Sequence, residues 1–131
     1  MTDEILEFIV MVNGGDSESE VLRAITERIP EAAEIEKDSC ELRGNRLEVW
    51  ANEDADPSRA TDEEEGYLYF RWRIEVLPQR DDVGEEAQVG LAGEMLGALR
   101  EDRGWDATLA ATFEDRVEEG RAEEGEEGSA E

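Results

Sequence analysis

An acidic loop is the first place in this sequence where side chains have the spacing of a metal site. Residues 52–63 read NEDADPSRATDE. Ligand-type side chains stand at the first, third, fifth and twelfth positions, as in a calcium-binding EF-hand loop: Asn52, Asp54, Asp56 and Glu63. However, Pro57 takes the sixth position, where the sharp turn of an EF-hand needs glycine, and the flanking segments have strand patterns. We therefore expect no EF-hand and no bound metal, with a looser cation site on these four residues as the alternative.

Nucleophilic and acid–base chemistry find few candidates in this chain. The sequence contains no histidine, which excludes Ser-His-Asp catalysis and histidine-ligated metals. Its single cysteine, Cys40, lies in a strand pattern and has no histidine to activate it. Close carboxylate pairs are unavoidable with 38 acidic residues, so their pairing carries little information. No cofactor motif is present. An enzyme with a carboxylate site near the 52–65 loop remains an alternative.

The charge of the chain says more about its surroundings than about its activity. Asp and Glu number 38 against 13 Lys and Arg, for a formal charge of −25, and Lys37 is the only lysine. Such self-repulsion destabilises a compact state unless salt screens it, since the Debye length falls from about 10 Å at 0.1 M salt to about 3 Å at 1 M. This composition resembles the acidic, lysine-poor proteins of salt-in halophiles, haloarchaea in particular. The resemblance implies a habitat and no particular function.

Apolar periodicity divides the chain into a folded part and a tail. Clustered apolar residues predict one domain over residues 1–113, whereas the acidic, low-complexity segment 114–131 is expected to be disordered. No apolar run approaches the ~20 residues of a membrane span. The N-terminal residues are acidic where a secretory signal would be basic. We therefore expect a soluble, cytoplasmic protein that does not contact membranes.

The first half of the folded part predicts a strand, a helix and a hairpin. Residues 4–13 form a strand whose two alternating sets are both apolar, as in a central strand. Ser17 with Glu20 has the pattern of a capping box for an amphipathic helix over 18–29. The strands of the hairpin then flank Gly44-Asn45 as a two-residue turn.

The second half predicts a strand, a helix and a strand. Residues 66–79 alternate strictly, 84–103 carry a broad apolar stripe, and 105–113 form the last strand. The order βαβββαβ predicts an α+β fold, a two-layer α/β sandwich. Two helices would cover one face of a mostly antiparallel sheet of about five strands, in a variant of the ferredoxin-like arrangement.

The sheet face opposite the helices is the strongest candidate for a binding surface. The expected alternation places aromatic and cationic side chains together there: Arg46, Trp50, Tyr67, Tyr69, Arg71 and Arg73. Ile9 and Met11 could join them from the first strand. Aromatic residues and Arg are enriched at protein interfaces, which favours a protein partner or a homodimer.

Two other interpretations of this face remain open. Base stacking with Arg–phosphate contacts would suit a nucleotide or single-stranded nucleic acid, although a charge of −25 disfavours a polyanion. Alternatively, Arg71 and Arg73 could pair with Glu48 and Glu75 and only stabilise the sheet. The sequence therefore predicts a non-enzymatic protein-interaction domain, with a small-ligand or nucleic-acid binder as the alternative.

Overall fold

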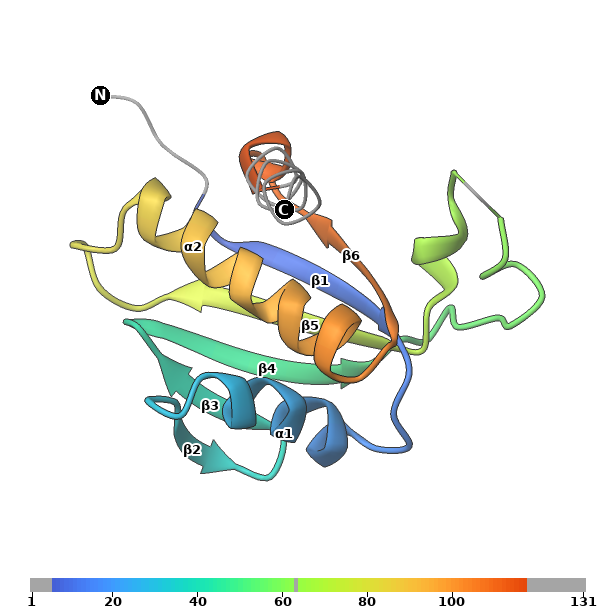
Figure 1. Cartoon of the computed structure of the whole chain (residues 1–131), viewed down its shortest axis with the longest axis horizontal. Helices are drawn as coiled ribbons and strands as arrows, with labels where there is room; N and C mark the ends of the chain where they lie inside the picture. Colours follow the sequence, from blue (N-terminus) through green and yellow to red (C-terminus); the bar gives the residue numbers. More distant parts are fainter. Residues whose placement is uncertain (1–5, 63, 118–131) are drawn as a thin grey trace, which may run out of the picture.

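The computed structural model describes residues 6–62 and 64–117, which form a mixed α+β domain (Figure 1). The strands are β1 (Phe8–Asn13), β2 (Ala33–Glu36), β3 (Ser39–Leu42), β4 (Asn45–Ala51), β5 (Trp72–Pro78) and β6 (Asp106–Ala110). The helical segments are α1 (Glu18–Arg28), the 3-10 helix η1 (Gly66–Tyr69), α2 (Glu85–Leu96) and η2 (Gly97–Asp102), a π-helical continuation of α2. Among the described residues, no helix is both long and apolar enough to span a bilayer.

The six strands make one antiparallel sheet in the order β2-β3-β4-β5-β1-β6. Helices α1 and α2 lie side by side across the same face of this sheet (Figure 1). The expected α+β class and antiparallel sheet are confirmed. The sheet has six strands rather than about five, because Ala33–Glu36 pairs with β3 at the edge. All four of its residues are exposed and it has little apolar alternation, so no local pattern indicated a strand.

Helix α1 begins where its capping residues predict. The hydroxyl of Ser17 accepts a hydrogen bond from the backbone N–H of Glu20 at 3.2 Å. The Glu20 carboxylate in turn accepts one from the N–H of Asp16 at 2.9 Å. The first contact satisfies an N–H that the first helical turn leaves unpaired, and the second satisfies the N–H of the residue just before the cap. The apolar side of the helix then packs on the sheet through Val21, Leu22, Ala24 and Ile25.

The turn between β3 and β4 differs from the expected one by a single residue. Its two central residues are Arg43 and Gly44, with φ of 51° and 81°, and Leu42 pairs with Asn45 across it. Two positive φ values suit the right-handed twist of a two-residue hairpin. The prediction of a Gly44-Asn45 turn is therefore wrong, because Asn45 is completely buried as the first residue of β4.

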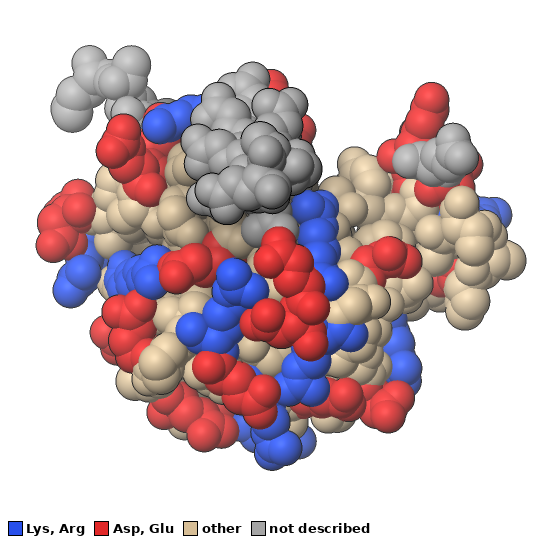
Figure 2. All heavy atoms as spheres, viewed as in Figure 1, with Lys and Arg blue, Asp and Glu red and all other residues tan. Residues whose placement is uncertain are grey.

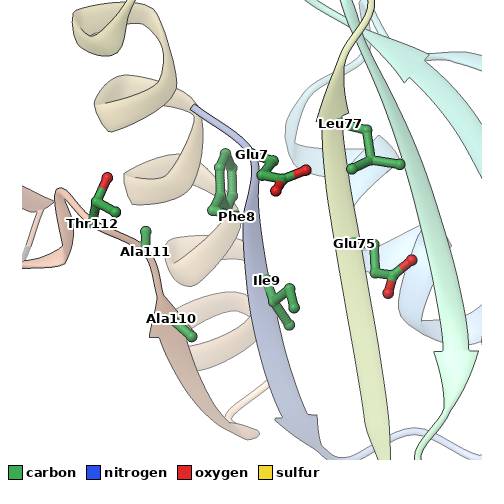
Figure 3. Close-up of a pocket in the computed structure, with 8 residues that line it drawn as sticks. All are labelled: Glu7, Phe8, Ile9, Glu75, Leu77, Ala110, Ala111 and Thr112. Carbon is green, nitrogen blue, oxygen red and sulfur yellow. The ribbon is translucent and has the colours of Figure 1, made fainter. Parts of the chain in front are cut away.

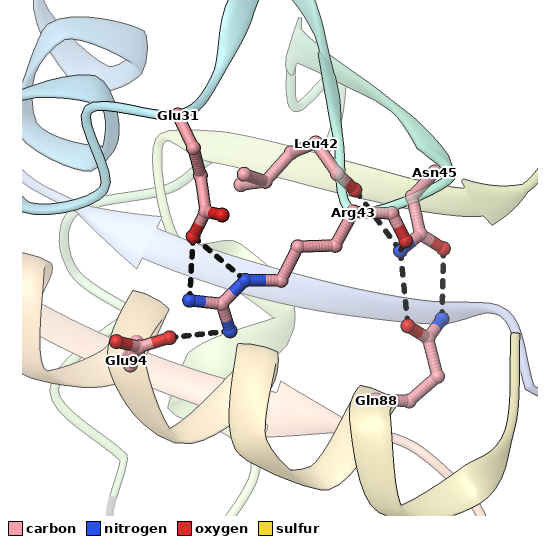
Figure 4. A network of polar contacts seen from close by, with 6 residues as sticks. All are labelled: Glu31, Leu42, Arg43, Asn45, Gln88 and Glu94. Atoms are coloured by element: carbon pink, nitrogen blue, oxygen red, sulfur yellow. Dashed lines mark hydrogen bonds and ion pairs between the residues drawn. The ribbon is translucent and has the colours of Figure 1, made fainter.

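The Asn45 side chain fastens this hairpin to α2 (Figure 4). Its amide nitrogen donates to Oε1 of Gln88 at 3.0 Å, and the Gln88 nitrogen donates back to Oδ1 of Asn45 at 2.8 Å. Asn45 also donates to the carbonyl of Leu42, and Gln88 to the carbonyl of Leu6. Both side chains are buried, so this reciprocal pair satisfies amide groups that would be costly to leave unpaired.

The expected strand over 66–79 begins only at Trp72. The Asn52 side chain donates to the carbonyls of Leu68 and Phe70 at 2.9 and 2.7 Å, and the segment before Phe70 coils into η1. Gly66 packs so closely on the preceding loop that an added Cβ would lie 2.4 Å from the carbonyl oxygen of Ala60. These tertiary contacts outweigh the local alternation. Leu68 is consequently 45% exposed instead of buried in the core.

The last elements follow the sequence more closely. The helix predicted over 84–103 is confirmed as α2 continued by η2, and Gly104 follows it with φ +70°. The expected final strand is shortened to β6. Residues 114–117 are helical; Val117 is buried, and Arg116 lies 2.6 Å from Glu85 in an ion pair. The rest of the expected tail, 118–131, lies outside the described residues.

The hydrophobic core fills the space between the two helices and the sheet. One side of each central strand contributes to it, alternating with residues that face away. The strand residues of this core are Phe8, Val10, Val12, Cys40, Leu42, Leu47, Val49, Trp72, Ile74, Val76, Ala107 and Leu109. The helical residues that meet them include Ile25, Leu91, Met95, Leu96 and Leu99. Within residues 6–62 and 64–117, neither α1 nor α2 covers the second side of the same strands.

Candidate functional site

The sheet face away from α1 and α2 is the candidate site, and we call it the open face. Strand register brings together on it residues from four adjacent strands. They are Arg46, Glu48 and Trp50 of β4, Arg73, Glu75 and Leu77 of β5, Ile9 and Met11 of β1, and Thr108 and Ala110 of β6. Ile9 was expected here because both alternating sets of the first strand are apolar, and the structure places it at the middle of the face.

Trp50 is the most prominent side chain of this face. It is 47% exposed, whereas its neighbour Val49 on the covered side is only 2% exposed. Trp50 pairs with Arg73 of β5 in the strand register. A half-exposed tryptophan is a large apolar surface in contact with water, and this residue type is enriched among the anchors of protein interfaces.

The cations of the open face are paired within their own strands. Nε of Arg46 lies 2.6 Å from Glu48, and Nη2 of Arg73 lies 3.3 Å from Glu75. The expected pairing of Arg73 with Glu75 is therefore present, although it runs along β5 instead of across strands. The sequence predicted a cationic face. Because each Arg has a carboxylate beside it, the face is instead mixed in charge.

Three of the six predicted site residues lie outside this face. Tyr67 and Tyr69 belong to η1, and the guanidinium of Arg59 stacks over the Tyr69 ring at 5.3 Å. Arg71 precedes β5 and donates to the carbonyl of Gly15 at 3.0 Å. The structure thus brings together Arg46, Trp50 and Arg73 but not the other three, because the alternation that grouped them does not continue as a strand before Trp72.

A hollow of about 450 Å³ lies on the open face across β5, β1 and β6 (Figure 3). Its apolar surface includes Ile9, Leu77 and Ala110, and the carboxylates of Glu7 and Glu75 lie beside these residues. We call this hollow the groove. Sequence reasoning missed it because Glu7 and Ala110 lie about a hundred residues apart in the chain and meet only through the pairing of β1 with β6.

Two buried polar atoms on the open side also lack hydrogen-bond partners. Within the described part of the chain, these are Oγ of Ser39 and Nε of Arg73. Ser39 pairs with Glu48 in the register, on the side of β3 opposite the buried Cys40. Unsatisfied buried polar atoms are uncommon in native proteins, and both of these lie on the side of the sheet opposite α1 and α2.

The opposite surface of the domain, over the helices, has a different character. Seen from that side, basic and acidic side chains are interleaved over α1 and η2 (Figure 2). Arg28 lies 3.1 Å from Asp102, and Arg103 lies 3.0 Å from Glu27. These ion pairs connect the two helical segments of one chain. This surface is therefore the charged, solvent-facing side of the helices that cover the core.

The acidic loop uses its ligand-type side chains internally. Besides its two donated hydrogen bonds, Asn52 accepts one from the N–H of Asp54 through Oδ1. Asp56 accepts hydrogen bonds from the hydroxyl and the N–H of Ser58, and these lower the pKa of its carboxyl. Glu63 lies outside the described residues. Among the residues that are described, no group of three or more His, Cys, Asp or Glu side chains could hold a metal ion.

Cys40 is unsuited to nucleophilic chemistry in the folded protein. It is fully buried in the core under the helices. Burial raises the pKa of its thiol to about 11, with a further contribution from the nearby Glu34 carboxylate. Because the thiolate is the nucleophilic form, this side chain acts as a small core residue.

Comparison with known proteins adds no family to this geometry. No protein-family model matches the chain, and no match was found among curated proteins or solved structures. The geometry of the open face is therefore the basis for a functional proposal.

Proposed function

We propose that this chain is a non-enzymatic interaction domain that associates with a second copy of itself through the open face. The observation that carries the proposal is the exposure of Trp50 on a sheet face that also holds the groove, on other strands. A sheet stabilises a domain by burying its apolar side chains against another layer. Here the second layer on one side would come from the other copy, as in a sheet-on-sheet sandwich.

The charges of the face favour a second copy over a strongly basic or acidic partner. Arg46 and Arg73 alternate with Glu48 and Glu75 on adjacent strands. A surface that carries both signs can be complementary to itself, which is the requirement for a two-fold symmetric interface.

A second copy also brings a second formal charge of −25. Mutual repulsion between two such chains opposes association at low ionic strength and is screened as salt rises. We propose that the protein works in the salt-rich cytoplasm that its composition suggests, where this repulsion is small. Association should therefore strengthen with KCl, whereas binding of a nucleic acid to the same arginines would weaken.

The strand order and the helix connections point to a more specific fold. Four strands run in the order β4-β5-β1-β6. Helix α2 connects β5 to β6 across β1, and the chain after α1 returns through β2 and β3 to β4, which is separated from β1 by β5. We propose that this part is the ferredoxin-like arrangement, extended at one edge by β2 and β3. In that arrangement one face of the sheet is open by construction, which leaves it available for contact.

The oligomeric state in multimolar KCl tests the proposal. Light scattering coupled to size exclusion should show a dimer for the wild type and a monomer for Trp50→Ala. Leu68→Ala is the control, since Leu68 is 45% exposed but lies on η1 and not on a strand of the open face. A wild type that stays monomeric at high protein concentration in KCl would contradict the proposal, as would equal effects of the two substitutions.

A further inference from the structure

The open face has two halves of different chemistry. Its β4 half carries the long side chains Arg46 and Trp50. Its β1 and β6 half carries the groove, with Glu7, Ile9 and Ala110 among its lining residues. Strand β5 lies between the halves. The first half therefore projects a cation and an aromatic ring, and the second offers an apolar hollow with carboxylates at its side.

In a dimer of two such faces, a two-fold axis can place one half of the first copy on the other half of the second. An axis parallel to the strands and between β5 and β1 would place β4 of one copy over β6 of its partner, because these are the outer members of β4-β5-β1-β6. Such an axis preserves position along the strands. Packed sheets deviate from perfect alignment by about 30° at a separation of about 10 Å, which side chains as long as Arg can span.

The register then decides which residues meet. In the strand register, Arg46 of β4 lies opposite Leu77 of β5, and Leu77 lines the groove together with Glu7. Arg46 of one copy consequently lies at the level of the groove of its partner. The same rule applies to Trp50. The register places Trp50, Arg73, Met11 and Thr108 at one level across the four strands. Trp50 of one copy therefore lies over β6 of its partner, near Thr108.

We propose that the groove of each copy receives Arg46 of the other copy, an inference that rests on the proposed self-association. The aliphatic part of Arg46 lies on Ile9, Leu77 and Ala110, and its guanidinium pairs with Glu7. Glu75, which also lines the groove, adds a second carboxylate. Symmetry makes the contact twice per dimer.

The bonding capacity of both partners agrees with this contact. The ion pair of Arg46 with Glu48 uses Nε, and a guanidinium has further donors on its two terminal nitrogens. Within the described part of the chain, no ion pair involves Glu7. An Arg can contact two carboxylates at once through its planar fork. The groove therefore matches an arginine with an aliphatic stem better than a compact ion.

Two charge reversals, made separately and then mixed, test the contact. Glu7→Arg alone places two arginines together at each contact, and Arg46→Glu alone places two glutamates together. Each variant should weaken its own dimer by about tenfold or more, as like charges do across an interface. An equimolar mixture of the two should form a heterodimer close to wild-type affinity, because both of its contacts then pair opposite charges.

Recovery by mixing is specific to a contact between copies. Loss of the Arg46–Glu48 pair within one chain cannot be repaired by a substitution on another chain. The matched control is Arg23→Glu, which makes the same charge change on the exposed side of α1 and should leave the dimer within about twofold of wild type. Circular dichroism in KCl verifies that each variant folds. If Arg46→Glu fails to fold, Arg46→Gln replaces it, and an unchanged dimer then overturns the contact.

The outcomes separate the two proposals. A wild-type dimer with weakened single variants and a recovered mixture supports both. A wild-type dimer whose mixture does not recover overturns the groove contact and leaves self-association standing. A monomeric wild type in KCl overturns both.

Discussion

The two faces of the sheet differ in how much of their side-chain surface is buried. On β4, Val49 is 2% exposed under the helices and the next residue, Trp50, is 47% exposed on the open face. On β5, the buried Ile74 lies between Arg73 and Glu75, which pair with each other in partial contact with solvent. Strand alternation alone produces this contrast.

The difference concerns polar groups as much as apolar area. On the covered side, the buried amides of Asn45 and Gln88 satisfy each other. On the open side, Ser39 Oγ and Arg73 Nε are buried without a partner in the described chain. A sheet face whose buried polar groups are all paired within the chain has the properties of a hydrophobic core. A face that leaves a tryptophan half-exposed has a property expected of an interface.

The largest effect should appear in thiol reactivity. Cys40 on the covered side should react with a disulfide reagent at neutral pH only through unfolding, about 10³-fold more slowly than an exposed thiol, because burial raises the pKa of its thiol to about 11 and excludes the reagent. A cysteine introduced as Ala110→Cys in the groove should react quickly in the monomer and slowly in the dimer. Spectrophotometric reaction rates at several protein concentrations test both statements. Fast reaction of Cys40 would show that the covered face opens without unfolding.

Truncation should separate the faces by stability. Ile74→Ala should lower the free energy of unfolding by about 2–5 kcal/mol, because it leaves a cavity in a fully buried site. Trp50→Ala should change the stability of the monomer by less than about 1 kcal/mol, as surface substitutions usually do. Denaturant unfolding at fixed KCl and low protein concentration measures both. Similar losses for the two variants would contradict the assignment of the faces.

The amide pair gives an intermediate effect. Gln88→Leu should destabilise the fold by about 1–3 kcal/mol, because the buried Asn45 side chain loses its partner. The same unfolding experiment measures it, with Gln79→Leu as a control in an exposed position just after β5. If Gln88→Leu were as stable as the wild type, the pair would not be what holds the hairpin to α2.

The smallest effect should come from the outer side of α2. Gly90→Ala should raise stability by about 0.5–1 kcal/mol, since nothing lies within 4 Å of the added methyl group and alanine favours the helix. Gly14→Ala is the opposing control, because its Cβ would lie 2.2 Å from Cγ of Trp105. Thermal unfolding in KCl should therefore shift upward for Gly90→Ala and downward for Gly14→Ala. A loss of stability at Gly90 would mean that the outer side of α2 is not open.

Much of the fold followed from local signals in the sequence. The cap at Ser17, the stripe of α2 and the alternation of β1, β4 and β5 each depend on neighbours a few residues away. The sequence also indicated Arg46, Trp50 and Arg73 as residues that share one face. These predictions held because period and capping are properties of short segments.

The errors occurred where distant contacts decide local structure. Residues 66–71 alternate like a strand, yet the Asn52 amide holds the carbonyls of Leu68 and Phe70 and the chain coils. Asn45 looked like a turn residue because Asn tolerates positive φ, but its side chain is needed by Gln88 43 residues away. The partners of these contacts are 16, 18 and 43 residues apart, well beyond the few residues over which period and capping act.

The sequence by itself determined the charge of this protein, its α+β class and the two-sided pattern of its strands, because composition and periodicity are local and additive. Only the tertiary structure decided which strands lie side by side, and hence that Glu7, Leu77 and Ala110 form one groove beside Arg46. The physical reason is that a sheet joins residues by hydrogen bonds between strands far apart in the chain, and this pairing is set by the packing of the whole domain.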